Sequence, residues 1–139
     1  MATVQTDLNR QIKELYSVYN SHDTERFLSL HTEDIFYEQV VADGAVVRGK
    51  EEYRKFVETS FATLPDLKCE LISFFTTGTR QCEEVVMTGT QTGSYFGLAP
   101  TGKQFSFRGV LVRELRDGKT SRLSIYWDNA SVLRQLGVT

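Results

Sequence analysis

The chain has 139 residues, the usual size of one domain, and its 40% hydrophobic and 24% charged residues are typical of globular proteins. A formal charge of −2 and the lack of any run of lysines or arginines argue against binding to nucleic acid or to a membrane surface. No apolar stretch is long enough to cross a bilayer, and the first residues do not resemble a signal peptide. We therefore expect a single domain over residues 1–139, located in the cytoplasm.

Two helices are predicted at the N-terminal end. Apolar residues recur every three or four positions across 4–19, which indicates one face of an amphipathic helix. Asp23 or Thr24 can then cap a second, short helix that carries Phe27 and His31.

A pair of strands and a third helix are predicted next. Residues 35–41 are rich in β-branched and aromatic side chains and predict a strand. The turn signal Asp43-Gly44 separates it from a short strand at 46–47. A helical spacing of apolar residues follows over 53–64 and stops at Pro65.

The apolar period then changes from helical to strand-like. Tight turns are expected at Thr77-Gly78 and Asp117-Gly118, with a longer glycine-containing connection at 93–103. Helices followed by a meander of antiparallel strands predict an α+β domain with helices on one side of the sheet. The four predicted strands cover 67–76, 81–92, 104–115 and 120–128.

The last helix and the cysteines complete the prediction. Asp128 is placed to cap a short closing helix that stops at Gly137. On the predicted hairpin, Cys69 falls opposite a residue near position 88 and therefore too far from Cys82 for a disulfide. We expect both thiols to be reduced and, with only two dissimilar histidines elsewhere, no metal site.

Three stretches of the sequence carry a family resemblance. They are Gly93–Lys103 (GSYFGLAPTGK), Phe107–Val110 (FRGV) and Tyr126–Gly137 (YWDNASVLRQLG). Together they resemble the SnoaL-like polyketide cyclases of the nuclear transport factor 2-like superfamily, and the opening residues 19–35 fit the same pattern. The resemblance implies a cone-shaped curved sheet wrapped on three helices, a deep pocket open at one end, and a homodimer formed through the outer sheet face.

The resemblance also implies a chemistry, and one position departs from it. Such cyclases close a ring by an intramolecular aldol reaction, with a buried carboxylic acid on the last strand, three residues before a second aspartate. Here the second aspartate is Asp128, but the acid position holds Ile125, which cannot transfer a proton.

Three residues are candidate catalytic groups, each with a structural alternative. Asp128 is the nearest carboxylate to the missing acid, but it also suits the helix cap. Arg108 could hold an enolate or carboxylate, although strand alternation favours an ion pair on the outer sheet face. A histidine side chain ordinarily titrates near neutrality, so His31 could be a base, or it could pack on its helix.

The remaining candidates are ligand-binding residues. The resemblance implies that they line a pocket with aromatic and aliphatic walls. Tyrosine side chains can pack in its wall and offer hydroxyls to a ligand carbonyl, or they can simply pack in the core. The candidate ligand-binding residues are Tyr16, Tyr19, Tyr37, Phe56, Leu123, Ile125 and Trp127.

These observations favour a cofactor-free acid–base enzyme of cyclase, isomerase, dehydratase or hydrolase type, acting on a small, apolar, polyketide-like molecule. The alternative is a non-catalytic binder of a hydrophobic metabolite, because of Ile125. A third hypothesis is an interaction protein that uses the outer sheet face.

Overall fold

The computed structural model describes residues 2–138, with side chains from Asp7 onward. Val4, the first residue of the apolar face predicted for the first helix, therefore lies outside the described side chains. The expected order of helices and strands is confirmed. The helices are α1 (Ala2–Asn20), α2 (Thr24–Leu28), α3 (Lys50–Thr63) and α4 (Asn129–Gln135). The strands are β1 (His31–Gln39), β2 (Val46–Arg48), β3 (Lys68–Thr77), β4 (Arg80–Thr90), β5 (Gln104–Arg116) and β6 (Lys119–Tyr126).

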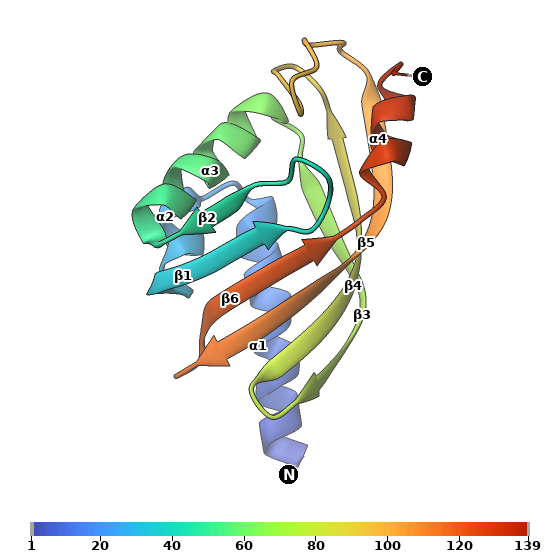
Figure 1. Cartoon of the computed structure of the whole chain (residues 1–139). Coiled ribbons are helices and arrows are strands. Elements are labelled where there is room, and N and C mark those ends of the chain that lie inside the picture. Colours follow the sequence, from blue (N-terminus) through green and yellow to red (C-terminus); the bar gives the residue numbers. More distant parts are fainter. Residues whose placement is uncertain (1, 139) are drawn as a thin grey trace.

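The six strands form one curved sheet in the order β2-β1-β6-β5-β4-β3, shown in Figure 1. Neighbouring strands are antiparallel except for β1 and β6, which run parallel with Tyr37 beside Leu123. The sheet is therefore mixed, whereas the sequence predicted an antiparallel one. No hairpin joins β1 to β6, so no turn forces them to be antiparallel. The α+β class is confirmed.

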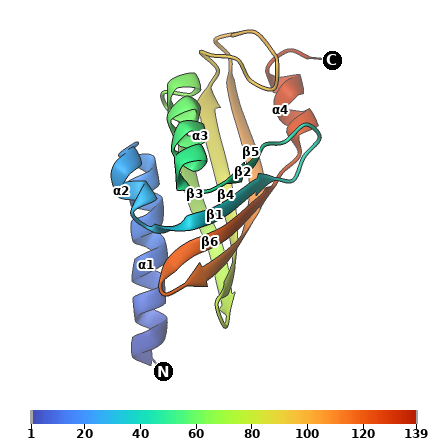
Figure 2. The ribbon, with the colours of Figure 1, turned by 60° about the vertical axis from the view of Figure 1, so that its left-hand side comes forward.

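Helices α1 and α3 lie on the same face of the sheet, as Figures 1 and 2 show. The first packs against β3 and the second against β1 and β2. Between them and the sheet lies the hydrophobic core, in which Ile35 and Val85 are fully buried. Among the described residues, no helix combines the length and apolar character that a bilayer crossing requires.

The first half of β5 extends beyond the end of β6, because the pairing of the two strands begins at Val110 and Tyr126. Helix α4 packs there, at the end of the molecule opposite the N-terminus (Figure 1). Its Gln135 side chain replaces a missing strand neighbour, since its oxygen accepts from the Ser106 amide at 2.8 Å and its nitrogen donates to the Ser106 carbonyl at 2.9 Å.

Two local predictions have clear outcomes. The assignment of His31 to the second helix is wrong: α2 ends at Leu28, and His31 is the first residue of β1. The hairpin register is nearly as predicted, because Cys69 pairs with Met87, and both Cys69 and Cys82 are free thiols.

Candidate functional site

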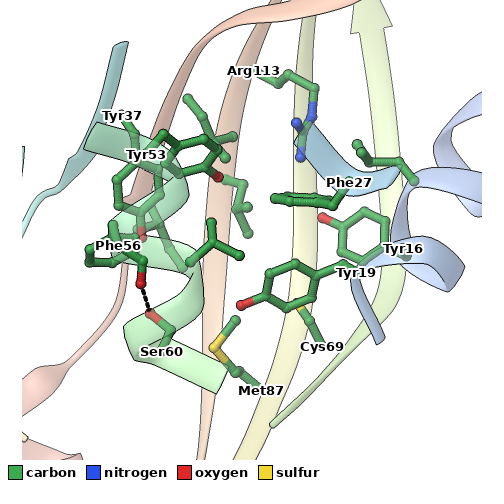
Figure 3. A pocket seen from close by; sticks show the side chains of 15 residues that line it. Tyr16, Tyr19, Phe27, Tyr37, Tyr53, Phe56, Ser60, Cys69, Met87 and Arg113 are labelled. Carbon is green, nitrogen blue, oxygen red and sulfur yellow. Dashed lines mark hydrogen bonds between the residues drawn. The ribbon is translucent and has the colours of Figure 1, made fainter. Parts of the chain in front are cut away.

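A cavity lies between α1, α3 and the inner face of β4, β5 and β6; we call it the inner chamber. Figure 3 shows Tyr16 and Tyr19 of α1 on one side of it and Tyr53 and Phe56 of α3 on the other. Its empty volume is about 530 Å³, part of which is its mouth. Leu111 and the other sheet residues in the wall are apolar except at one end, where Arg113 enters.

A second, outer chamber adjoins the first and has an empty volume of about 800 Å³, again with part of its mouth. Three of its rings stand almost parallel along the wall. The planes of Phe105 and Phe107 differ by 6° at a centroid distance of 6.3 Å, and those of Phe107 and Trp127 by 18° at 5.3 Å. The two chambers share the side chains of Tyr19, Tyr37, Phe56, Ser60, Met87 and Ile125.

The 93–103 connection contributes part of the outer chamber's wall. Gln91, which is fully buried, fixes this segment by donating to the Leu98 and Ala99 carbonyls and accepting from Thr101. Tyr95 also donates to Asn129 Oδ1 at 2.7 Å. The rim of the chamber is thus tied to the start of α4.

A buried ionic network closes the inner chamber. Arg113 donates from Nε to Glu83 Oε2 at 2.8 Å and from Nη2 to Glu83 Oε1 at 3.0 Å. Tyr16 donates to Glu83 Oε1 at 2.6 Å, and Arg113 Nη1 donates to Thr120 Oγ1 at 2.8 Å. The side chains of Arg113 and Glu83 are 4% and 0% exposed. Tyr16 and Arg113 line the chamber, while Glu83 lies behind them.

The network fixes the charge states at this end of the chamber. Burial opposes the charge on Arg113, but the Glu83 carboxylate outweighs burial and holds the pKa of the guanidinium above its usual value. Burial, followed by the same carboxylate, raises the pKa of Tyr16 far above its usual value. The phenol is therefore a neutral donor at pH 7, and Arg113 keeps two further N–H groups beyond the three that it uses.

Other polar groups in the wall of the inner chamber are tyrosine hydroxyls, the hydroxyl of Ser60, which donates to the Phe56 carbonyl, and one thiol. Burial raises the pKa values of Tyr19, Tyr37 and Tyr53, so all three stay protonated near neutrality. Within the described part of the chain, the hydroxyls of Tyr19 and Tyr53 have no hydrogen-bond partner. Burial, and then Glu83, raises the pKa of Cys69 to about 12, which makes this thiol a weak nucleophile.

His31 lies one layer behind the inner chamber, in contact with two of its wall residues. Its ring centroid is 4.5 Å from that of Phe27 and 5.2 Å from that of Tyr53. Nδ1 is 2.8 Å from the Phe27 carbonyl and must donate to it, so Nε2 carries no proton and has no partner in the described part of the chain. Burial, and then the charge of Arg113, lowers the pKa of His31 to about 3.

Two of the three candidate catalytic residues lie away from both chambers. Asp128 is exposed, and its side chain accepts from the Ser131 amide at 3.1 Å as the N-cap of α4. Arg108, with 65% of its side chain exposed, forms an ion pair with Glu84 at 3.2 Å on the opposite face of the sheet. Asp128, Arg108 and His31 are therefore not brought together.

The candidate ligand-binding residues do converge on the cavity. Both chambers are lined by Tyr19, Tyr37, Phe56 and Ile125. The inner chamber alone is lined by Tyr16 and Leu123, and the outer chamber alone by Trp127.

The sequence reasoning missed Glu83, Arg113 and Tyr53. A signal for Arg113 was present, because the inward positions Phe105 and Phe107 continue by twos through 109 and 111 to 113. The same alternation on β4 places Glu83 beside inward-facing neighbours. Within the described residues, no three histidine, cysteine or acidic side chains group as a metal site would require.

Solved structures share this architecture. IdmH of Streptomyces antibioticus, a candidate polyketide cyclase, superposes with a TM-score of 0.77 at 26% identity over 94% of this chain and 98% of its own. A candidate SnoaL-like polyketide cyclase of Jannaschia sp. CCS1 gives 0.83 at 18% identity over 96% and 94%. A Catenulispora acidiphila protein with a ketosteroid isomerase-like fold gives 0.79 at 17% identity over 93% of each chain.

Sequence comparison gives a consistent answer. A search of curated proteins found no significant match. The family model described as SnoaL-like polyketide cyclase, however, matches residues 7–136, which is nearly the whole chain. The motifs, the fold and this match agree, and the chain belongs to the SnoaL-like polyketide cyclase family.

Proposed function

We propose that the protein is a cofactor-free enzyme that takes a flat, mainly apolar small molecule into the two chambers and polarises one of its carbonyl oxygens at the Arg113 end. The observation that carries this proposal is a buried guanidinium with unused N–H groups at the closed end of a mainly apolar cavity. A polyketide-like substrate is consistent with the family and with the likeness to IdmH, a candidate polyketide cyclase.

The shape of the wall favours a flat ligand. Phe105, Phe107 and Trp127 present nearly parallel rings, and stacked aromatic contacts favour planar partners. Burial of such a ligand against apolar walls supplies most of its affinity, at about 25 cal/mol per Å² of apolar surface removed from water. The few polar groups then fix its orientation.

The closed end supplies hydrogen-bond donors for a developing negative charge. Two N–H groups of Arg113 and the hydroxyl of Tyr53 are available to a carbonyl oxygen there. Preorganised donors in a site without bulk water stabilise an oxyanion more strongly than water does. Removal of one such donor typically costs about 10²–10³ in kcat.

Proton transfer has to proceed without a carboxylate in the wall. Among the described residues, neither chamber is lined by an aspartate, a glutamate or a histidine. The family resemblance places Ile125 where the cyclases carry their acid. Tyr16 can accept a proton from the ligand while it passes its own to Glu83, 2.6 Å away. This relay is the proton route that the geometry supports best.

The test combines binding and turnover. Trp127 is the only tryptophan and lines the outer chamber, so its fluorescence reports a flat ligand directly. We would titrate a panel of aromatic 1,3-diketones and follow their conversion by liquid chromatography and mass spectrometry. The proposal predicts that Tyr16→Phe lowers kcat with little change in KM, that Arg113→Met lowers both binding and turnover, and that Arg108→Met changes neither. Unchanged turnover in both cavity variants would refute it.

A second candidate function is binding without turnover. It is favoured by the absence of a carboxylate from the described chamber walls and by Ile125. It predicts saturable quenching of Trp127 by compounds that are recovered unchanged. Under this hypothesis, the folded variant Ile125→Asp gains conversion of a bound diketone, whereas a lack of any gain counts against loss of the acid as the cause of inactivity.

A further inference from the structure

A third cavity lies beyond the closed end of the inner chamber, between α1, β4 and the β5–β6 hairpin; we call it the back cavity. Its empty volume is about 620 Å³, part of which is its mouth. Leu15 and Arg113 line both the back cavity and the inner chamber, so single side chains separate the two spaces. Ile12, Leu30 and Leu115 form apolar parts of the wall, and Gln11 and Glu14 of α1 form polar ones.

The floor of the back cavity is polar and incompletely hydrogen-bonded. Gln81 pairs with Arg113 across β4 and β5 and is only 4% exposed. Within the described residues, its side-chain amide has no hydrogen-bond partner. The amide atoms are not sealed from solvent; they face the open space of the cavity, where a ligand can take the place of water as their partner.

The other floor residues are also able to bind. Arg113 uses three of its five N–H groups on Glu83 and Thr120, which leaves two. The hydroxyl of Thr120 accepts from Arg113 and can still donate its own proton. Donors from Arg113 and Thr120 therefore stand beside an amide of Gln81 that can both donate and accept.

The charges around the back cavity favour a neutral ligand. Arg113 is already neutralised by the bidentate contact with Glu83. At the mouth, Glu14 is paired with Arg26 at 3.5 Å. An added anion would leave an uncompensated negative charge next to Glu83 in a buried site, which is costly.

We propose that the back cavity is a second binding site, for a small neutral molecule that carries an amide or ketone carbonyl on a compact apolar body. The carbonyl accepts from Arg113 and from the Gln81 amide, and the apolar body packs on Leu30 and Leu115. The ligand does not enter the two main chambers, but its site shares the side chain of Arg113 with the function proposed for them.

The test uses δ-valerolactam, a neutral cyclic amide, and ¹⁵N-labelled full-length protein. The side-chain NH₂ pair of Gln81 gives its own signals, identified by their loss in Gln81→Met. Titration should shift these signals and the backbone amides of Leu115 and Gly118 saturably, with nuclear Overhauser contacts from the lactam to the methyl groups of Leu30. Cyclopentanecarboxylate, the matched anion, should not compete.

Variants locate the site and guard against misfolding. Gln81→Met, which is nearly isosteric, should weaken lactam binding about tenfold through the loss of hydrogen bonds. Leu30→Trp should abolish binding by filling the cavity, whereas Ile125→Phe, which fills the main chambers, should leave it unchanged. The Overhauser contacts are measured on the wild-type protein, so they test the site even if a variant fails to fold. Absence of saturable shifts, or contacts that map to Tyr37 and Phe56 instead, would overturn the proposal.

Discussion

Arg113 and Glu83 meet on the inner face of neighbouring strands in a two-pronged ion pair, with nitrogen–oxygen distances of 2.8 and 3.0 Å. Adjacent to Glu83 in sequence, Glu84 points to the opposite face and pairs with Arg108 in solvent. Two successive glutamates thus make the same kind of contact in opposite environments.

The buried pair should be sensitive to the loss of one partner. Glu83→Gln leaves the Arg113 charge without compensation, and we expect a loss of about 3–5 kcal/mol in the free energy of unfolding. Glu84→Gln, the control, should cost no more than about 1 kcal/mol. Urea denaturation measures both. The double variant Glu83→Gln/Arg113→Met should recover much of the loss; equal effects of the two single variants would contradict the assignment.

His31 predicts a dependence of stability on pH. Its pKa is about 3 when folded and 6.5 when unfolded. Between these values the unfolded chain binds a proton that the folded chain does not, so stability falls as pH is lowered, by up to about 1.4 kcal/mol per pH unit. Above pH 6.5 His31 is neutral in both the folded and the unfolded chain, so it no longer makes stability depend on pH. His31→Gln should give a shallower slope from pH 6 to pH 4 in urea denaturation; an unchanged slope would argue against a buried neutral imidazole.

Asp128 offers a direct choice between capping and catalysis. We expect Asp128→Ala to cost about 1 kcal/mol of stability, and Asp128→Ser, which keeps a capping oxygen, to restore most of it. Ligand binding and turnover should follow the wild type in both variants, as measured by Trp127 fluorescence and product analysis. A loss of turnover in the stable Asp128→Ser variant would instead assign a catalytic role.

The outer sheet face carries apolar side chains suited to the homodimer that the family resemblance predicts. Phe75 is 69% exposed and Tyr126 44%, and Val112 lies on the same face. Phe75→Arg should shift the protein from dimer to monomer in sedimentation velocity. Val138→Arg, a similar change at an exposed residue near the C-terminus, serves as the control. If the wild-type protein sediments as a monomer, the predicted homodimer is wrong.

Gln91 should control the order of the segment at the mouth of the outer chamber. Gln91→Leu removes its hydrogen bonds to Leu98, Ala99 and Thr101. We expect faster amide hydrogen exchange across 93–103 and weaker quenching of Trp127 by flat ligands, with unchanged exchange in β3. Exchange that is equally fast throughout the chain would indicate global destabilisation instead.

Local signals in the sequence predicted most elements, because caps and tight turns depend on neighbouring residues. Asp128 caps α4, and Gly78 adopts a positive φ of 57° at the β3–β4 turn. His31 was misplaced because α2 has only five residues, too few for periodicity to mark its end. The parallel pairing of β1 with β6 could not be read locally, since it depends on the fold as a whole.

The site was predicted only where it is apolar. Tyr37, Phe56 and Ile125 follow from the pattern and the resemblance, and they line the cavity. The Arg113–Glu83 network was missed because a charged residue normally marks a solvent-facing position. An inward-facing charge is tolerated there because Arg113 on β5 forms an ion pair with Glu83 on β4. A single sequence does not reveal this pairing between strands.

The pairing of β1 with β6 also sets the order of events during synthesis. Strand β1 acquires this neighbour only after residues 119–126 have been made, so β1 and β2 cannot join the main sheet before β6 has left the ribosome. Contacts of such long sequence separation form slowly. Until then, the inner faces of α1 and α3 lack part of their cover, and a nascent chain stopped before β6 presents an unsatisfied strand edge to its neighbours.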